Sequence, residues 1–219
     1  MFKHNFIELP SLTRIDGETR LYETPDGNRY PSVTTVLDKM SDKSGLIAWR
    51  KRVGDAEADK ISSQATRRGT AVHKMCEDFV LNDVKELEVQ MPSNIHMYKQ
   101  LNKFLSADVD NIMCSESSLF SHYLKIAGTV DLIAEYKGKP AIIDFKTSGK
   151  LKARQYIENY FLQTALYSYM FWEMTNIMCP TIVITIAIEE ETEPQIFVER
   201  SSAYIEKARD ICKAYHLKY

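Results

Sequence analysis

Residues 128–147 read GTVDLIAEYKGKPAIIDFKT, and this stretch decides the fold. A strand-like run ends at Tyr136, the dipeptide Lys137-Gly138 follows, and a second apolar run ends in Asp144-Phe-Lys146. Two such runs joined by a short glycine-containing turn predict an antiparallel β-hairpin. We expect this hairpin to form the middle of a sheet.

The hairpin gathers charged side chains on one face. Side chains alternate along a strand, so Asp144 and Lys146 share a face while Phe145 points to the other. With the turn as above, the antiparallel register places Asp131 directly opposite Asp144. Like charges in that position repel, with Cβ atoms only about 4.5–5.5 Å apart. A hard cation such as Mg²⁺ would relieve the repulsion, and Lys146 could orient or activate an attacking water and offset phosphate charge.

Two alternatives stay open at this point. An ordinary hairpin with a salt bridge between Asp144 and Lys146 on its solvated face would need no metal. A bulge next to Pro140 would slip the register by one residue and turn Asp131 to the wrong face.

The chain before the hairpin is mostly helical. A turn signal at Pro25–Asn28 predicts a small hairpin over residues 20–30. Helical periodicity extends over residues 44–81, with a new helix expected to start at Gly69, and again over residues 94–105.

The chain after the hairpin alternates helix and strand. We expect a long helix over residues 153–172, strands over residues 181–188 and 195–199, and a closing helix over residues 201–216. The pattern predicts an α/β (α+β) fold, with a central mixed sheet flanked by helices and a helical N-terminal half.

Composition limits the classes of protein and of partner that fit the chain. The 28 basic and 30 acidic residues nearly balance, so any nucleic-acid surface must be local. The four cysteines are widely spaced, which is typical of buried or free thiols rather than of a zinc or redox site. Neither a signal-peptide pattern nor a membrane-spanning run is present, so we expect a cytoplasmic protein that is not secreted and has no membrane partner.

Four motifs occur in order: Arg68-Gly-Thr-Ala-Val-His73, Gly128-Thr-Val-Asp131, Ile143-Asp-Phe-Lys-Thr147 and Gln163-Thr-Ala-Leu-Tyr167. Together they resemble the PD-(D/E)XK nuclease superfamily, whose core is restriction-endonuclease-like, and its RecB-like exonuclease branch. With Tyr30-Pro-Ser-Val-Thr-Thr-Val-Leu37 and Trp49, residues 20–175 resemble the mitochondrial genome maintenance exonuclease family and its phage-encoded relatives.

The resemblance implies a role for each matched residue. The implied ligands of Mg²⁺ or Mn²⁺ are Asp131, Asp144, the Phe145 carbonyl, His73 and, as an auxiliary, Glu116. Lys146 is implied to be catalytic and to support the nucleophile, and Gln163 and Tyr167 would steady Lys146 or the DNA. Val130 stands where the superfamily name has proline, and the chain lacks the clustered cysteines of the iron-sulfur subgroup, so we expect no iron-sulfur cluster.

Simpler interpretations exist for the supporting residues. His73 and Glu77 lie four residues apart, so pairing on the helix surface would explain Glu77. Gln163 and Tyr167 share a helical face, but much of that helix is apolar, and Tyr167 could be packing.

Local basic residues predict a path for the DNA backbone. The candidates are Arg67, Arg68, Lys150, Lys152 and Arg154, with a further basic run at Arg50-Lys51-Arg52. Aromatic residues that could stack on unpaired bases are Trp49, Tyr156, Tyr160 and Phe161, and core packing is the alternative for Trp49 and Phe161.

The resemblance implies a metal-dependent exonuclease that hydrolyses phosphodiester bonds from single-stranded DNA ends by in-line attack of a metal-activated water. DNA replication, recombination, repair or phage DNA metabolism would be its setting, in a bacterial host cell if phage-encoded. The alternatives are a structure-selective endonuclease and a non-catalytic DNA-binding module. We expect one nuclease domain over residues 1–219, comprising an N-terminal hairpin and lead-in (1–43), a helical region (44–110) and the catalytic sheet with its helices (111–219).

Overall fold

The computed structural model describes residues 1–17, 19–83 and 90–219. Its centre is a sheet with the strand order β4-β5-β6-β7-β8. These strands are β4 (Val109–Ser121), β5 (Ile126–Tyr136), β6 (Lys139–Ser148), β7 (Thr181–Ile188) and β8 (Gln195–Arg200). β6 and β7 run parallel and the other neighbours antiparallel, so the predicted mixed sheet is confirmed.

The predicted hairpin consists of β5 and β6. Lys137 and Gly138 have φ angles of 49° and 74°, the left-handed backbone that a two-residue turn of type I′ requires. Leu132 lies opposite Ile143, so the predicted register is confirmed up to this pair and no slip occurs at Pro140. The ladder ends there, however, one residue before the two aspartates would meet.

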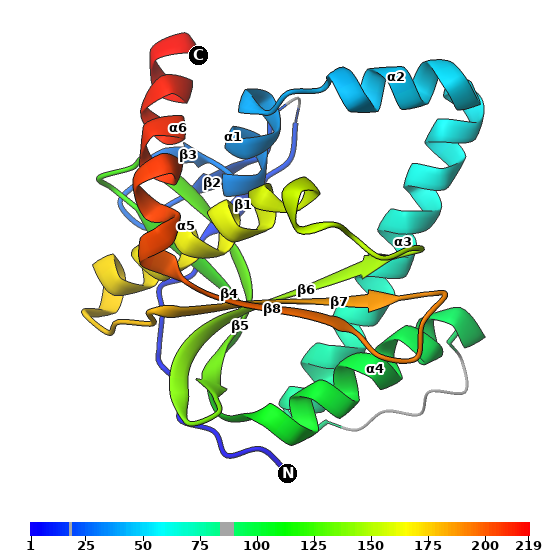
Figure 1. Ribbon diagram of the computed structural model, residues 1–219. Coiled ribbons are helices and arrows are strands. Elements are labelled where there is room, and N and C mark those ends of the chain that lie inside the picture. Colours follow the sequence, from blue (N-terminus) through cyan, green and yellow to red (C-terminus); the bar gives the residue numbers. More distant parts are fainter. Residues whose placement is uncertain (18, 84–89) are drawn as a thin grey trace.

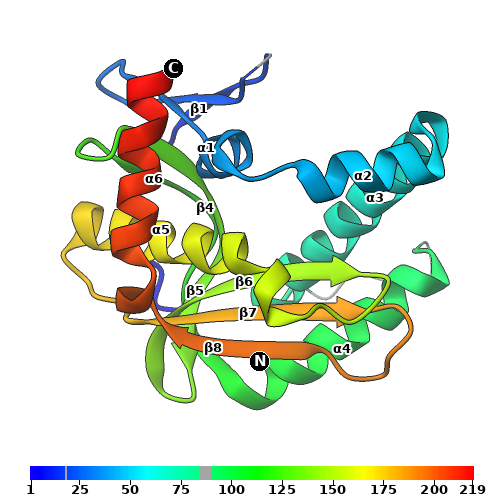
Figure 2. The same cartoon turned by 45° about the horizontal axis from the view of Figure 1, so that its top comes forward.

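Helices cover both faces of the sheet (Figures 1 and 2). α5 (Glu158–Thr175) lies on one face, with α1 (Val33–Met40) and α6 (Ile205–Lys218) packed around it. α3 (Asp55–Val80) and α4 (Pro92–Asp108) lie on the other. α5 also makes the crossover between β6 and β7 that parallel strands require.

Each face of the sheet has its own apolar core. Phe161 and Leu166 of α5 pack in one core together with Ile133 of β5. Leu101 of α4 packs in the other together with Leu132, the neighbour of Ile133 in β5. A strand buried on both faces places successive apolar residues in opposite cores, which explains the nearly continuous apolar runs of the hairpin.

The helical N-terminal half differs from prediction in one respect. The helix break falls at Gly54, which has a φ of 87° and separates α2 (Ser44–Val53) from α3. The predicted start at Gly69 is wrong, because Gly69 lies inside α3, where its α-carbon faces Thr147 of β6. No residue of α2 is buried, and α2 with the first turns of α3 extends away from the sheet (Figure 1).

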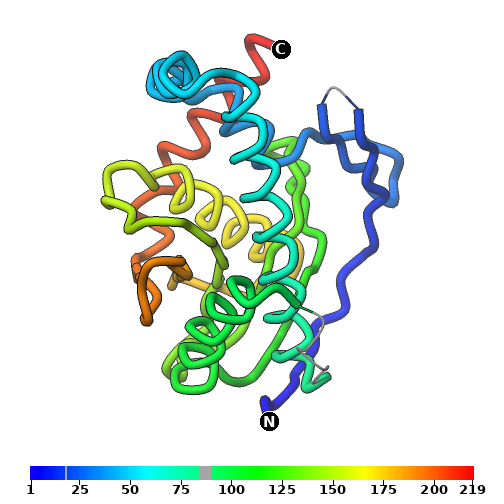
Figure 3. Tube along the Cα trace, turned by 90° about the vertical axis from the view of Figure 1, so that its right-hand side faces the viewer, coloured from blue at the N-terminus to red at the C-terminus, as the bar shows by residue number. Residues whose placement is uncertain are grey.

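A small N-terminal sheet comprises β1 (Thr13–Ile15), β2 (Leu21–Glu23) and β3 (Arg29–Pro31). β2 and β3 form the hairpin predicted around Pro25–Asn28. The segment before it runs along the main body, where the backbone N–H of Asn5 donates to the Ile112 carbonyl of β4 at 2.8 Å (Figure 3).

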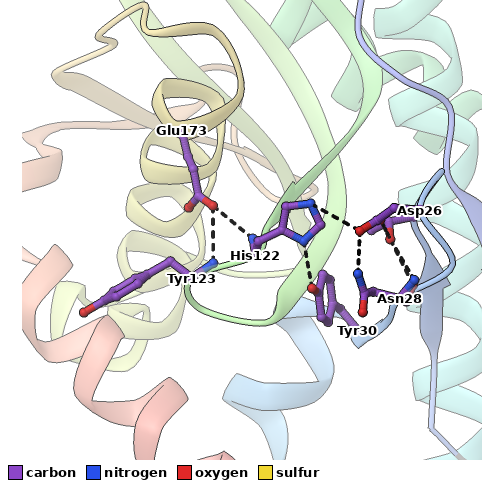
Figure 4. A network of polar contacts seen from close by, with 7 residues as sticks. Asp26, Asn28, Tyr30, His122, Tyr123 and Glu173 are labelled. Atoms are coloured by element: carbon purple, nitrogen blue, oxygen red, sulfur yellow. Dashed lines mark hydrogen bonds and ion pairs between the residues drawn. The ribbon is translucent and has the colours of Figure 1, made fainter.

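A polar network holds this small sheet to the body (Figure 4). His122, in the turn between β4 and β5, shares a 2.8 Å hydrogen bond between its Nδ1 and the Tyr30 hydroxyl and lies 3.9 Å from Asp26. Glu173 of α5 accepts hydrogen bonds from the backbone N–H groups of His122 and Tyr123. The network therefore ties three separate parts of the chain together.

Within the described residues, the remaining elements are two short 3₁₀ helices, η2 (Arg154–Tyr156) and η3 (Ser201–Ala203). The four cysteines are buried free thiols, as predicted. None of the helices in the described ranges is long and apolar enough to cross a membrane.

Candidate active site

The site forms where β5 and β6 stop pairing. Instead of a ladder bond, the Asp131 carboxylate Oδ2 accepts a 2.8 Å hydrogen bond from the backbone N–H of Phe145. β6 continues from there beside β7, with Asp144 opposite Ile184. The two aspartates thus lie at the point where the strands diverge and not in a cross-strand pair, which corrects the register extrapolation.

Three potential ligands converge on the α3 side of this point. His73 of α3, Glu116 of β4 and Asp131 of β5 each offer one donor atom, and these atoms all lie within 4.8 Å of one another. His73 Nδ1 is 3.6 Å from Asp131 Oδ2. One nitrogen and two carboxylate oxygens suit a divalent cation such as Mg²⁺ or Mn²⁺.

Glu116 reaches this cluster through an unusual backbone. Its φ is 45°, a left-handed value inside a strand that costs about 1 kcal/mol or more for a residue other than glycine. Ser115 and Ser117 on either side keep the pairing with β5, opposite Leu132 and Val130. The local distortion therefore aims one side chain without breaking the strand pair.

The charges of the cluster suit a divalent cation. Partial burial and the neighbouring Asp131 carboxylate raise the pKa of Glu116 to about 7. Burial disfavours the charged form of His73, but Asp131 more than offsets this, so the pKa of His73 is raised. Burial likewise opposes ionisation of Asp131, and the charge on His73 prevails, so the pKa of Asp131 is lowered. A proton on His73 thus supplies the positive charge that a metal ion would bring, and metal binding releases such protons.

The α5 side of the site is already paired. Asp144, which is 1% exposed, forms an ion pair with Lys146 and accepts a 3.3 Å hydrogen bond from the Gln163 side-chain amide. The Lys146 ammonium also lies over the Tyr160 ring, 5.2 Å from its centroid. Burial and Asp131 raise the pKa of Asp144 to about 6, although Lys146 acts in the opposite direction.

Tyr167 links two of the sequence motifs. Gln163 donates a 3.3 Å hydrogen bond to the Tyr167 hydroxyl. A Cβ atom at Gly128 would lie only 3.0 Å from the Tyr167 ring, so a glycine at the start of the Gly-Thr-Val-Asp motif makes room for this tyrosine. Tyr167 is buried in the core on the α5 side, as the packing alternative predicts, and it also joins the two motifs.

The predicted DNA-binding residues differ in how they are paired. Arg67 is exposed, and Arg68 pairs with Glu189. Lys150 and Arg154 pair with Glu190 and Glu199, respectively. Lys152 is bound through its backbone to the Gln195 side chain, which leaves its own side chain exposed.

Several other expectations need correction or refinement. Glu77 pairs with Lys74 at 2.8 Å and not with His73. Phe161 is 1% exposed and belongs to the core, whereas Tyr156 is 78% exposed. Trp49 is partly buried. The contact of Tyr160 with the Lys146 ammonium was not anticipated from the sequence, where Tyr160 was only a stacking candidate.

The mixed sheet, with an aspartate on β5 and an Asp-x-Lys sequence on β6, defines a restriction-endonuclease-like fold. Comparison with known proteins agrees with this class. The sequence profile of the PD-(D/E)XK nuclease superfamily matches residues 97–214, which is more than half of the chain. The chain therefore belongs to the PD-(D/E)XK nuclease superfamily.

Individual relatives match over a shorter part of their length. Mitochondrial genome maintenance exonuclease 1 of Mus musculus is 27% identical over 132 residues, which cover 57% of this chain and 39% of the relative. The protein of the same name from Xenopus tropicalis is 29% identical over 147 residues, which cover 63% of this chain and 42% of the relative. The chain thus spans about two fifths of the length of these curated relatives.

A solved structure shows a partial likeness. The crystal structure of a candidate exonuclease from Eubacterium rectale matches 69% of this chain and 65% of its own, with a TM-score of 0.45 and 12% sequence identity.

Proposed function

We propose that this chain is a metal-dependent DNA exonuclease that hydrolyses phosphodiester bonds from single-stranded ends. The observation that carries the proposal is the convergence of His73, Glu116 and Asp131 within 4.8 Å, with Asp131 on the hairpin that also holds the Asp144–Lys146 pair. The proposed setting is DNA replication, recombination or repair, or phage DNA metabolism.

The cation of this proposal is Mg²⁺ or Mn²⁺. His73, Glu116 and Asp131 would hold it, with Asp144 and the Phe145 carbonyl as further ligands. When bound, such an ion lowers the pKa of water and offsets charge on the phosphate. Glu116 is the solvent-exposed member of the set, so the site opens to substrate on that side.

Lys146 is placed to act on the substrate. Its ammonium is partly accessible, with 21% of the side chain exposed, whereas its partner Asp144 is almost fully buried. Tyr160 and Asp144 restrict its position, and it can donate hydrogen bonds to the attacking water or to a phosphate oxygen. Gln163 keeps the Asp144 carboxylate oriented for this pairing.

Support for single-stranded DNA comes from two exposed surfaces. The last turn of the exposed α2 contains Arg50-Lys51-Arg52. Arg50 pairs with Asp55 and Asp59, and Lys51 and Arg52 would supply positive charge for phosphates. Tyr156 presents an exposed ring just before α5, and aromatic rings stack on unpaired bases with little sequence preference. The relatives are named as exonucleases, which favours action at strand ends.

The proposal is tested by a time course on linear single-stranded DNA, double-stranded DNA and circular single-stranded DNA, each with Mg²⁺, Mn²⁺ or a chelator. We expect degradation of the linear single strand with either metal, none with chelator, and an intact circle. A Lys146→Ala variant should be inactive, while Lys139→Ala, at the far end of β6, should match the wild type. Cleavage of the circle would indicate an endonuclease, and DNA binding without hydrolysis would indicate a binding module.

A further inference from the structure

Arg68 has an incomplete set of hydrogen bonds. Its Nη1 donates to the Glu189 carboxylate at 2.8 Å. Its Nε is buried and has no hydrogen-bond partner among the described residues. A buried donor without an acceptor is costly and calls for an explanation, and a ligand that supplies the missing acceptor is one.

The position of Arg68 connects it to the catalytic strand. It precedes His73 by five residues on α3, and the adjacent Gly69 faces Thr147, the residue after Lys146. Glu189 is attached to the same strand, because its backbone N–H donates to the Ser148 carbonyl at 2.9 Å. The Arg68–Glu189 pair therefore sits at the end of β6 that carries Lys146.

The two partners differ in how firmly they are held. The Arg68 side chain is 20% exposed, so its guanidinium is largely fixed against the protein. The Glu189 side chain is 46% exposed, so its carboxylate can turn into water at little cost. An incoming anion would therefore displace the glutamate rather than the arginine.

Two other predicted DNA-binding cations also pair with glutamates, but in these pairs the cation is the more exposed partner. Lys150 lies 4.0 Å from Glu190, and Arg154 pairs with Glu199. All three carboxylates come from the end of β7, the turn after it, or β8. Three of the five predicted DNA-binding cations thus face carboxylates from one β-hairpin.

We propose that Arg68 is a binding site for a phosphate of the DNA backbone, and that Glu189 occupies it until a substrate phosphate takes its place. The proposal rests on the proposed function. A phosphate offers several acceptor oxygens and can engage Nε and an Nη group of arginine together. It would satisfy the buried Nε, which the single contact with Glu189 does not.

The test is the equilibrium binding of a short fluorescent single-stranded oligodeoxynucleotide in chelator, where hydrolysis is absent. Glu189→Gln removes the competing charge, so we expect binding about threefold to tenfold tighter at low salt. Arg68→Gln should weaken binding and reduce the slope of log Kd against log salt by about 0.7. Arg68→Lys keeps the charge without the guanidinium fork, and its affinity for the oligonucleotide should fall between those of the wild type and Arg68→Gln.

A double variant distinguishes replacement of Glu189 by a DNA phosphate at Arg68 from a general effect of removing one negative charge. In the Arg68→Gln background, Glu189→Gln should no longer tighten binding. The matched control is Glu193→Gln on the same connection, because Glu193 pairs with Lys103 of α4. We expect this control to bind like the wild type.

Two results would overturn the proposal while leaving the nuclease function intact. One is unchanged affinity in Glu189→Gln. The other is an equal gain from Glu189→Gln with and without Arg68. A wild-type chain that binds no DNA under any condition would instead overturn the proposed function, and this inference with it.

Discussion

The two sides of the site differ in how their charges are balanced. On the α3 side, Glu116 and Asp131 lie close together, and His73 is the basic member of the cluster. On the α5 side, Asp144 has a resident cation in Lys146 and an orienting amide in Gln163. The difference indicates that the first side depends most on a cation from solution, whereas on the second side Lys146 already offsets the charge of Asp144.

The largest effect is expected on the α3 side. Asp131→Asn removes the central ligand, and we expect hydrolysis of linear single-stranded DNA to fall by about 10³-fold or more. The rise in melting temperature on adding Mn²⁺ should also disappear, because a ligand stabilises only a fold that binds it. Asp210→Asn on α6 is the control. An Asp131→Asn variant that keeps the Mn²⁺ shift would remove Asp131 from the metal site.

Lys146→Ala should separate catalysis from metal binding. We expect a loss of activity of about 10²- to 10⁴-fold, while the Mn²⁺ shift in melting temperature is retained. Stability should also decrease, because Asp144 loses its buried partner. Lys146→Arg keeps the positive charge beside Asp144, so it tests activity in a variant that should be more stable than Lys146→Ala. Loss of the Mn²⁺ shift in both variants would contradict the division between the two sides.

Gln163→Leu should have a smaller effect on the α5 side. It removes the amide that orients Asp144, and loss of such a supporting contact typically reduces activity by about 10- to 100-fold. We expect the loss to appear mainly in kcat, with DNA affinity in chelator little changed. An equal loss in DNA affinity would instead assign Gln163 to substrate binding.

Gly128→Ala tests the packing that joins the motifs. The new methyl group would lie 3.0 Å from the Tyr167 ring, and such overpacking costs about 1–3 kcal/mol in the free energy of unfolding. Urea denaturation measures this cost. Gly149→Ala has no neighbouring atom within 4 Å of the added carbon and is the matched control. Equal stability of the two variants would show that Tyr167 moves freely.

Glu116→Gln should have the smallest effect on stability, and this effect should be a gain rather than a loss. The raised pKa of Glu116, about 7, means that the wild type without metal loses stability as the pH rises from the unfolded value of 4.5 to 7. The variant lacks this loss, so in chelator it should be more stable above that range and equal below it. Water screens the exposed carboxylate, so we expect a gain of only about 0.5 kcal/mol. A Glu116→Gln variant that is less stable than the wild type in chelator above pH 7 would contradict the repulsion between Glu116 and Asp131.

The hairpin and its register were predictable because they depend on local sequence. Lys137-Gly138 specify the turn, and the apolar runs specify the strands. The contact between Asp131 and the Phe145 N–H was not predictable. The predicted register assumes that β5 and β6 stay paired through Asp131 and Asp144, but in the structure β6 pairs only with β7 from Asp144 onward. The break at Gly54 rather than Gly69 was missed because both are glycines in helical patterns, and only the backbone angle distinguishes them.

Some site residues were found only through the order of motifs. His73 and Gln163 come from helices on opposite faces of the sheet, and no local pattern places them beside the hairpin. The pairing of Arg68 with Glu189 joins residues 121 positions apart, so it could not be read from spacing.

The division of the site is tested most directly by anomalous X-ray diffraction from crystals grown with Mn²⁺. We expect a peak bounded by His73, Glu116 and Asp131, about 2.0–2.3 Å from the coordinating atoms. A peak remote from all three residues, or the same peak in crystals of Asp131→Asn, would contradict it.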